Sequence, residues 1–111
     1  MLDSVLLSTK QMLGISPEDT SFDVNVIMNI NTALSILMDL GLTEVEDQLV
    51  IDDKMTWDDL LGGRTDIEYV KTYVYQKVKL IFDPPTSTAA IDAMQRSINE
   101  LEWRICNNGR N

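Results

Sequence analysis

The side chains most capable of chemistry are carboxylates, which gather between positions 44 and 59 with Lys54 as the only base among them. Two adjacent pairs, Asp52-Asp53 and Asp58-Asp59, have the hard oxygen ligands that a cation such as Ca²⁺ prefers. Neighbouring side chains diverge, however, and the D-x-[DN]-x-[DN]-G spacing of a calcium loop is missing. A solvated acidic loop therefore explains these residues better than a metal site.

Other reactive groups are equally scarce. The chain contains no histidine, which excludes Ser-His-Asp and Cys-His catalysis and removes the commonest neutral metal ligand. Cys106 is the single cysteine, so an intrachain disulfide is impossible, and a small hydrophobe is its ordinary role. Gly62-Gly63-Arg64 lacks the spacing and the Lys-Ser/Thr of a phosphate loop and indicates a turn between helices. We expect no catalytic residues, no cofactor and no metal site.

Two tryptophans are the best candidates for contacts with another protein. Tryptophan is enriched at protein interfaces, and both Trp57 and Trp103 lie beside charged residues. Burial inside the domain is the alternative for each of them. The tyrosines Tyr69, Tyr73 and Tyr75 complete a predicted core face with few lysines around them, so stacking on nucleic-acid bases is disfavoured.

The composition is that of a single folded domain spanning residues 1–111. Hydrophobic residues make up 44% and charged residues 24% of the chain, close to ordinary globular usage. With 18 acidic and 9 basic residues the formal net charge is -9, and this surplus repels nucleic-acid phosphate. Polar residues interrupt the longest apolar segment, residues 24–42, so no membrane span is expected. The first residues lack a secretory pattern, which predicts synthesis in the cytosol.

Glycine, proline and hydrophobic spacing predict an all-α fold, a small bundle of about four main helices. The main helices are expected at residues 2–13, 23–40, 66–82 and from Thr86 or Ser87 to residue 106. Gly14 and Gly41 are expected to end the first two, and Leu40 belongs to the apolar side of the second. A short helix is expected to start with Thr56 as N-cap and Asp59 at the capping-box position. The helix at 66–82 is hydrophobic on two adjoining faces, which include Ile81 and Tyr69, and is predicted to be central. In the last helix Trp103 lies about 160° from the middle of the apolar stripe.

Residues 43–63 are predicted to form an irregular acidic loop. Leu49, Val50 and Ile51 are its one candidate short strand. A single strand has nothing to pair with inside one subunit, so we expect this edge to pair with a neighbouring subunit.

Four stretches together are similar to the phage head-tail connector family, whose members are also labelled DNA-packaging proteins. They are SFD at 21–23 followed by the helix to residue 40, MTWDDLLG at 55–62, VKTYVYQKVKLIFDPP at 70–85 and ELEWR at 100–104. The resemblance extends from about residue 16 to residue 105, and FDPP and ELEWR are its most specific parts. It transfers no catalytic residue to this chain.

The resemblance implies a helical virion protein, made in the host cytoplasm, that forms a ring on the portal protein of the filled capsid. It implies a dodecamer in the virion, a contact with the next neck or tail-completion protein, and DNA that passes through the channel without specific binding. The candidate subunit or portal contacts are Trp103, Trp57, Arg104, Leu49, Val50 and Ile51. The candidates to face the channel or a basic neighbour are Glu44, Glu46, Asp47, Asp52 and Asp53.

The alternative function is a small acidic helical adaptor or regulator that binds one protein partner. Such a protein works as a monomer or dimer, whereas a connector forms annular particles. Particle size therefore separates the two functions.

Overall fold

The computed structural model describes residues 4–40, 50, 52–61 and 67–108. This part of the chain folds into helices, as predicted: α1 (Val5–Leu13), α2 (Asp23–Asp39), α3 (Trp57–Leu61), α4 (Ile67–Phe82) and α5 (Thr88–Asn108). Within these residues the only β pairing is an isolated antiparallel bridge between Ser4 and Thr56. The all-α prediction is confirmed.

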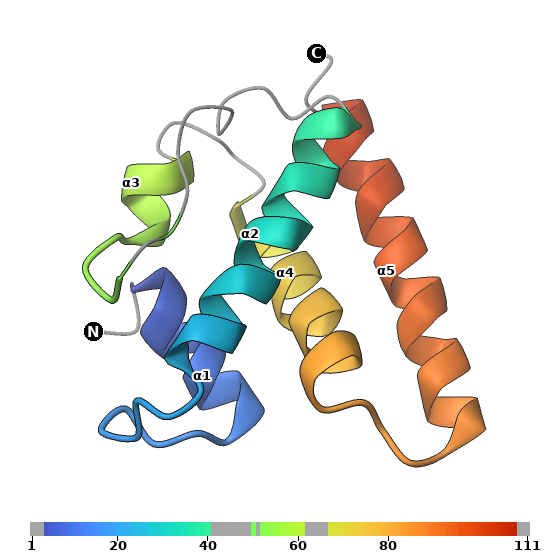
Figure 1. The fold of residues 1–111 in the computed structure, drawn as a ribbon. Helices are drawn as coiled ribbons and strands as arrows, with labels where there is room; N and C mark the ends of the chain where they lie inside the picture. The colour runs from blue at the N-terminus through green and yellow to red at the C-terminus, as the bar shows by residue number, and fades with distance from the viewer. Residues whose placement is uncertain (1–3, 41–49, 51, 62–66, 109–111) are drawn as a thin grey trace.

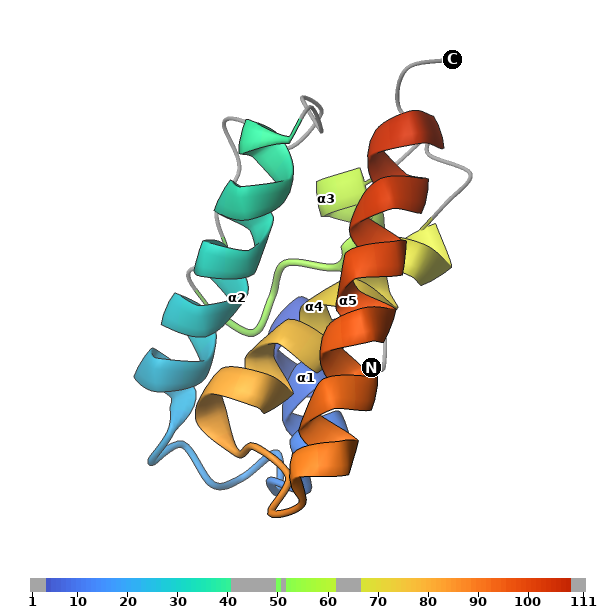
Figure 2. The same cartoon turned by 90° about the vertical axis from the view of Figure 1, so that its right-hand side faces the viewer.

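Helix α4 is the centre of the bundle, because each of the other four helices packs against it. Figure 1 shows α2 in front of α4, with α5 on the right, α1 at the lower left and α3 at the upper left. The view turned by 90° in Figure 2 shows α2 and α5 on either side of α4. The central position predicted for the helix at 66–82 is therefore confirmed.

Helix α1 begins and ends where side-chain and backbone capping dictate. The Ser4 hydroxyl accepts a hydrogen bond from the backbone N–H of Leu7 at 3.2 Å, so the helix begins at Val5 rather than at residue 2. Gly14 has a φ of 79°, the left-handed conformation in which a helix commonly stops, and its N–H bonds to the carbonyls of the last turn. The predicted stop at Gly14 is confirmed.

A buried ion pair joins α1 to the start of α2. Lys10 is 1% exposed, and its Nζ lies 2.8 Å from Asp23 Oδ1 and donates to the Pro17 carbonyl at 3.2 Å. The Asp23 contact is an ion pair rather than a well-directed hydrogen bond, because Asp23 Oδ1 accepts no hydrogen bond in the described residues. The pair fastens the segment between the two helices onto the bundle.

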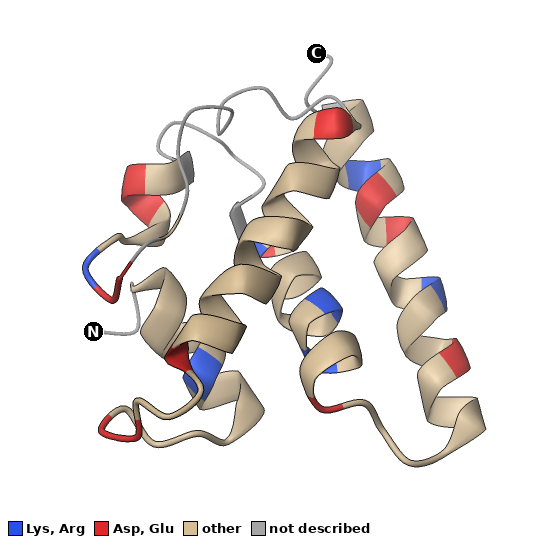
Figure 3. Cartoon of the chain, viewed as in Figure 1, with Lys and Arg blue, Asp and Glu red and all other residues tan. Residues whose placement is uncertain are grey.

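Helix α2 is amphipathic, and its only charged residues are its first and its last. Its inner side buries Val26, Ile30, Ala33, Leu34 and Leu37. Between Asp23 and Asp39 it has no charged residue, and Figure 3 shows this stretch free of the red and blue of charged side chains. Leu40 follows as the C-cap, one residue before the predicted stop at Gly41, which lies outside the described residues.

The segment at 52–61 is fixed to α1 by backbone pairing. Val5 N–H donates to the Met55 carbonyl at 2.9 Å, beside the bridge between Ser4 and Thr56. Thr56 and Asp59 form the predicted capping box: Thr56 Oγ1 accepts from Asp59 N–H at 2.9 Å, and Asp59 Oδ2 accepts from Thr56 N–H at 3.2 Å. The short helix α3 therefore starts where the sequence predicts.

Helices α4 and α5 are separated by the proline pair that follows Asp83. Proline donates no backbone hydrogen bond, which ends α4 at Phe82. Ser87, one of the two predicted caps, accepts from the N–H of Ala90 at 3.1 Å and starts α5. The last helix then continues to Asn108, two residues beyond the prediction.

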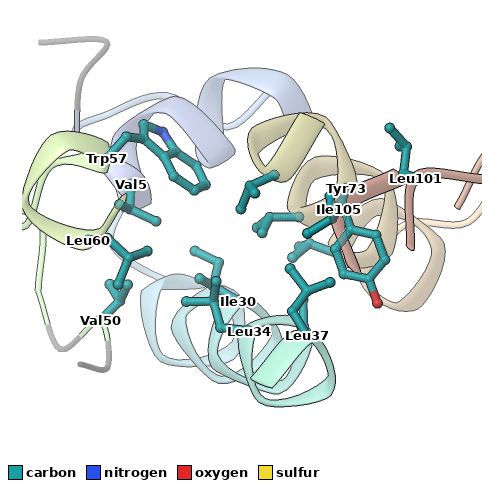
Figure 4. Packing of buried hydrophobic residues seen from close by; sticks show 14 of the residues in the cluster. Val5, Ile30, Leu34, Leu37, Val50, Trp57, Leu60, Tyr73, Leu101 and Ile105 are labelled. Atoms are coloured by element: carbon teal, nitrogen blue, oxygen red, sulfur yellow. The ribbon is translucent and has the colours of Figure 1, made fainter. Parts of the chain in front are cut away.

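All five helices and Val50 contribute to one core. Figure 4 shows Trp57, Val5 and Leu60 at one end of this core and Tyr73 and Ile105 at the other. The three residues Ile98, Leu101 and Ile105 of the predicted α5 stripe are buried, with Leu101 at 9% exposure and the other two at 0%. The core is therefore continuous along α4.

Two predicted core residues of α4 are exposed instead. Tyr69 is 43% and Ile81 51% exposed, whereas Val70, Val74 and Val78 are fully buried. Both exposed residues lie in the terminal turns of α4, and the neighbouring helices cover its middle turns more fully. The prediction that these two side chains complete the core is wrong for that reason.

Candidate protein interface

Trp103 is the largest apolar side chain on the described surface. It is 65% exposed and projects from the C-terminal half of α5, away from the buried stripe. The helical spacing predicts this orientation, and the structure confirms it. A tryptophan exposed to this degree is a candidate contact, because burying it against a partner removes a large apolar area from water.

A groove borders Trp103 on the side of α2. Its volume is about 460 Å³, and it is lined by Leu40, Asn99, Glu102, Trp103, Cys106 and Asn107. Leu40, at the end of α2, is 41% exposed. The groove therefore combines two exposed apolar side chains with amide and carboxylate groups, the mixture expected of a protein-binding surface.

A second groove lies between α4 and the same half of α5. Its volume is about 390 Å³, and it is lined by Tyr69, Ser97, Glu100, Leu101 and Arg104. Arg104 is held in place on one wall, because its guanidinium lies 2.7 Å from Glu100 Oε2 and its Cζ lies 5.9 Å from the centre of the Tyr69 ring. The hydrogen bond to Glu100 raises the pKa of Arg104, whose positive charge is paired with the Glu100 carboxylate.

A partly buried hydrogen bond fixes α5 on α4 beneath these grooves. The Tyr73 hydroxyl donates to Glu102 Oε2 at 2.8 Å, and the Tyr73 residue is fully buried. Burial and the Glu102 carboxylate both raise the pKa of Tyr73 well above its ordinary value. Glu102 also lines the groove beside Trp103, so this contact holds one wall of the surface.

Trp57 does not belong to this surface. It is 3% exposed, its indole N–H donates to Ser8 Oγ at 2.9 Å, and its ring packs edge-to-face on Tyr75 with centres 6.0 Å apart. These contacts satisfy both the polar and the apolar parts of the side chain within the subunit. The assignment of Trp57 as a subunit or portal contact is corrected to a core position.

Val50 is also a core residue rather than an open strand edge. It is fully buried, its N–H donates to Asn31 Oδ1 at 2.9 Å, and its carbonyl accepts from Asn31 Nδ2 at 2.9 Å. The Asn31 amide thus takes the place of a β-strand partner, so pairing with a neighbouring subunit at Val50 is not available. Leu49 and Ile51, the other members of the candidate strand, lie outside the described residues.

The acidic candidates are only partly described. Asp52 and Asp53 are exposed, with Asp52 Oδ1 accepting from Lys54 N–H at 2.9 Å and the Asp53 carbonyl accepting from the Ser4 hydroxyl at 2.8 Å. Glu44, Glu46 and Asp47 lie outside the described residues. The two described aspartates therefore have exposed carboxylates above a backbone that is fixed to α1.

The described residues hold no cluster of three or more histidine, cysteine or acidic residues able to bind a metal ion. None of the helices in the same part of the chain is long and apolar enough to cross a membrane. The sequence interpretation missed Leu40 and Tyr69 as surface residues because it placed both on core faces. Their position in terminal helical turns is the signal that indicates exposure.

Comparison with known proteins gives one finding. Searches of curated proteins and of solved structures found no match. The model of the family described as phage connector protein matches residues 5–111, which is nearly the whole chain and includes every described helix. The chain therefore belongs to the phage connector protein family and has a structural role in the head-tail connector of a phage.

Proposed function

We propose that this protein forms a ring docked on the portal protein of the filled capsid. The ring, a dodecamer in the virion, extends the DNA channel and joins the head to the next neck or tail-completion protein after DNA packaging. Membership of the connector family supports the proposal, since the family match covers residues 5–111. No enzymatic step is part of the function.

The observation that carries the proposal is the exposed Trp103, which lines one groove, next in sequence to Arg104, which lines a second. An interface of ordinary size is centred on a few buried aromatic or arginine anchors surrounded by polar groups. Trp103 is 65% exposed and Arg104 is held by Glu100 next to it, which gives such an anchor pair on one helix. We assign this surface to the contact with a neighbouring subunit or the portal.

The charge of the chain suits a channel that passes DNA without holding it. The formal net charge is -9, and Asp52 and Asp53 are exposed. Carboxylates facing the lumen repel the phosphate backbone and reduce sticking. We propose that Asp52 and Asp53, together with some of Glu44, Glu46 and Asp47, face the channel or a basic neighbour.

Particle imaging tests the ring. Purified protein, alone and with portal complexes, is examined by light scattering and negative-stain electron microscopy. Annular particles, or a ring added to the portal, are expected. Protein that stays a monomer or dimer at high concentration and leaves portal particles unchanged contradicts the proposal and favours the adaptor alternative.

Duplex DNA tests the channel wall. In a binding assay at low salt, where electrostatic effects are strongest, the assembled ring is expected to show no tight binding to free duplex ends or linear duplex. Tight binding under these conditions would overturn the repulsive-channel part of the proposal while leaving ring formation intact.

A further inference from the structure

The outer side of α2 is a solvent-exposed helix surface without charge. Every exposed residue between Asp23 and Asp39 is neutral, and together they form what we call the α2 ridge: Val24, Asn25, Met28, Thr32 and Ser35. Val24 is 73% and Met28 60% exposed, although each is apolar. The same stretch is the uncoloured front helix of Figure 3. Interface centres are depleted of charged residues, and this ridge has none; its one methionine, Met28, is of a type enriched at interfaces.

A second, nearly uncharged surface lies between α1 and α5. It is a shallow groove of about 200 Å³, here called the methionine groove, lined by Met12, Tyr75, Gln76, Lys79 and Met94. Met12 is 60% exposed, and the single charge in the groove, Lys79, is paired with Asp83 at 3.0 Å. Flexible methionine side chains on both walls can adapt to a partner's apolar side chains.

The ridge and the groove lie on opposite sides of α4. Successive helical residues turn by about 100°, so Gln76 points about 160° away from Val74, which is fully buried in the core. Helices α1 and α5 form the walls of the groove, whereas α2 covers the other side of α4, in front of it in Figure 1. One copy therefore presents two different neutral surfaces in opposite directions.

Charge determines which surfaces two copies can bring together. Each chain has a formal net charge of -9, so close approach of two copies through acidic surfaces is repulsive. The α2 ridge and the methionine groove are neutral or internally neutralised, and they meet without burying an unpaired charge. A second copy of this chain thus fits both surfaces, each against the other.

We infer that the α2 ridge of one subunit docks in the methionine groove of the next subunit. The inference rests on the proposed ring and specifies one contact between its subunits, on surfaces other than that of Trp103. Contacts between two different surfaces of the same chain are head-to-tail, and they close into a ring when the rotation between subunits allows it. Met28 is the central apolar residue of the ridge and enters between Met12 and Met94.

The floor of the groove contains a polar group that the neighbour can satisfy. Gln76 lines the groove, and its side-chain oxygen is buried and accepts no hydrogen bond within the described residues. A buried carbonyl without a donor is unfavourable, and it gains a partner if the Gln76 side chain turns toward a donor that docks in the groove. The ridge carries the Asn25 side-chain amide, which is exposed and able to donate.

A charge-swap experiment tests the contact on the full-length protein. Met28→Lys and Met12→Glu are made singly and together on one chain, with Ala89→Lys and Ala89→Glu as controls that add the same charges at an exposed position of α5. Assembly is followed by light scattering and electron microscopy, alone and on portal complexes, and folding by circular dichroism. Both methionines are exposed, so all variants are expected to fold.

Each single variant should raise the protein concentration needed for half assembly by at least roughly tenfold, because it places an unpaired charge in the contact. The double variant should restore most of the assembly, because a head-to-tail contact sets the new cation of one copy beside the new anion of the next. The Ala89 controls should assemble like the wild type.

Other outcomes overturn the inference in distinguishable ways. Rings that form at the wild-type concentration in both single variants show that the ring exists but uses other surfaces. If Met28→Lys abolishes assembly and adding Met12→Glu does not restore it, α2 contacts either α2 of another copy or a different protein. A wild-type chain that forms no ring even on portal complexes refutes the proposed function together with this contact.

Discussion

Replacing Trp103 by alanine should damage assembly far more than folding. The residue is 65% exposed, so about one third of its surface is covered within the subunit. A tryptophan buries roughly 200 Å² when fully covered, and about 25 cal/mol per Å² gives a loss of about 1.7 kcal/mol for that third. Alanine is the better helix former by about 0.5 kcal/mol, which leaves a net destabilisation of about 1 kcal/mol.

The association energy at stake is larger. If a partner covers the remaining two thirds, about 130 Å² leaves water, which corresponds to about 3 kcal/mol per contact. This value lies within the range of an interface hot spot and equals roughly a 100-fold change in the association constant. Assembly into a ring multiplies the effect over several contacts, so annular particles should disappear at concentrations where the wild type forms them.

Two measurements separate the effects. Urea unfolding followed by circular dichroism gives the change in folding free energy, and light scattering with electron microscopy gives the change in assembly. Trp57→Ala is the matched contrast, because Trp57 is 3% exposed and its removal should cost about 4 kcal/mol of folding stability.

A Trp103→Ala variant that loses as much folding stability as Trp57→Ala would place Trp103 in the core. A variant that assembles at the wild-type concentration would leave Trp103 without a partner in the ring.

Three further predictions concern the contacts that hold the subunit. Asp23→Ala should destabilise the fold by about 3 kcal/mol in urea unfolding, because it leaves the buried Lys10 ammonium without its carboxylate partner. Lys10→Met removes the buried charge and should cost clearly less. Equal losses of folding stability in the two variants would contradict this explanation. Asn31→Ala removes both hydrogen bonds to the Val50 backbone and should lower folding stability by about 2 to 4 kcal/mol. Asn31→Asp keeps the acceptor for Val50 N–H, so its stability should lie between those of the wild type and Asn31→Ala. A loss below about 1 kcal/mol in Asn31→Ala would contradict the role of Asn31 in holding Val50. The raised pKa of Tyr73 means that its neutral form stabilises the fold fully below the ordinary tyrosine pKa of about 10, and that this stability is lost as the pH rises above it. Between about pH 8 and pH 11 the urea midpoint of the wild type should therefore fall more than that of Tyr73→Phe, and parallel falls would refute the contribution of Tyr73.

Local sequence signals determine where most helices of this protein begin and end. Apolar spacing and capping residues predict the helices, and the Thr56 and Asp59 box and the Ser87 cap are found where the sequence places them. These features depend only on residues within a few positions of one another, which is why a single sequence reveals them. The outward direction of Trp103 follows from the same helical period, and it is fully predictable.

Contacts between distant residues decide the rest. The buried Trp57 donates a hydrogen bond to Ser8, 49 residues away in the sequence, and the buried Val50 donates one to Asn31, 19 residues away. Lys10, the one charged residue of α1, is buried because Asp23 lies beside it in space. Helical periodicity predicts which side of a helix is apolar. It does not predict which other helix packs against that side, or at which residue the packing ends. Only the tertiary structure therefore shows that Trp57 is core, that Tyr69 is surface, and that two neutral faces lie on opposite sides of α4.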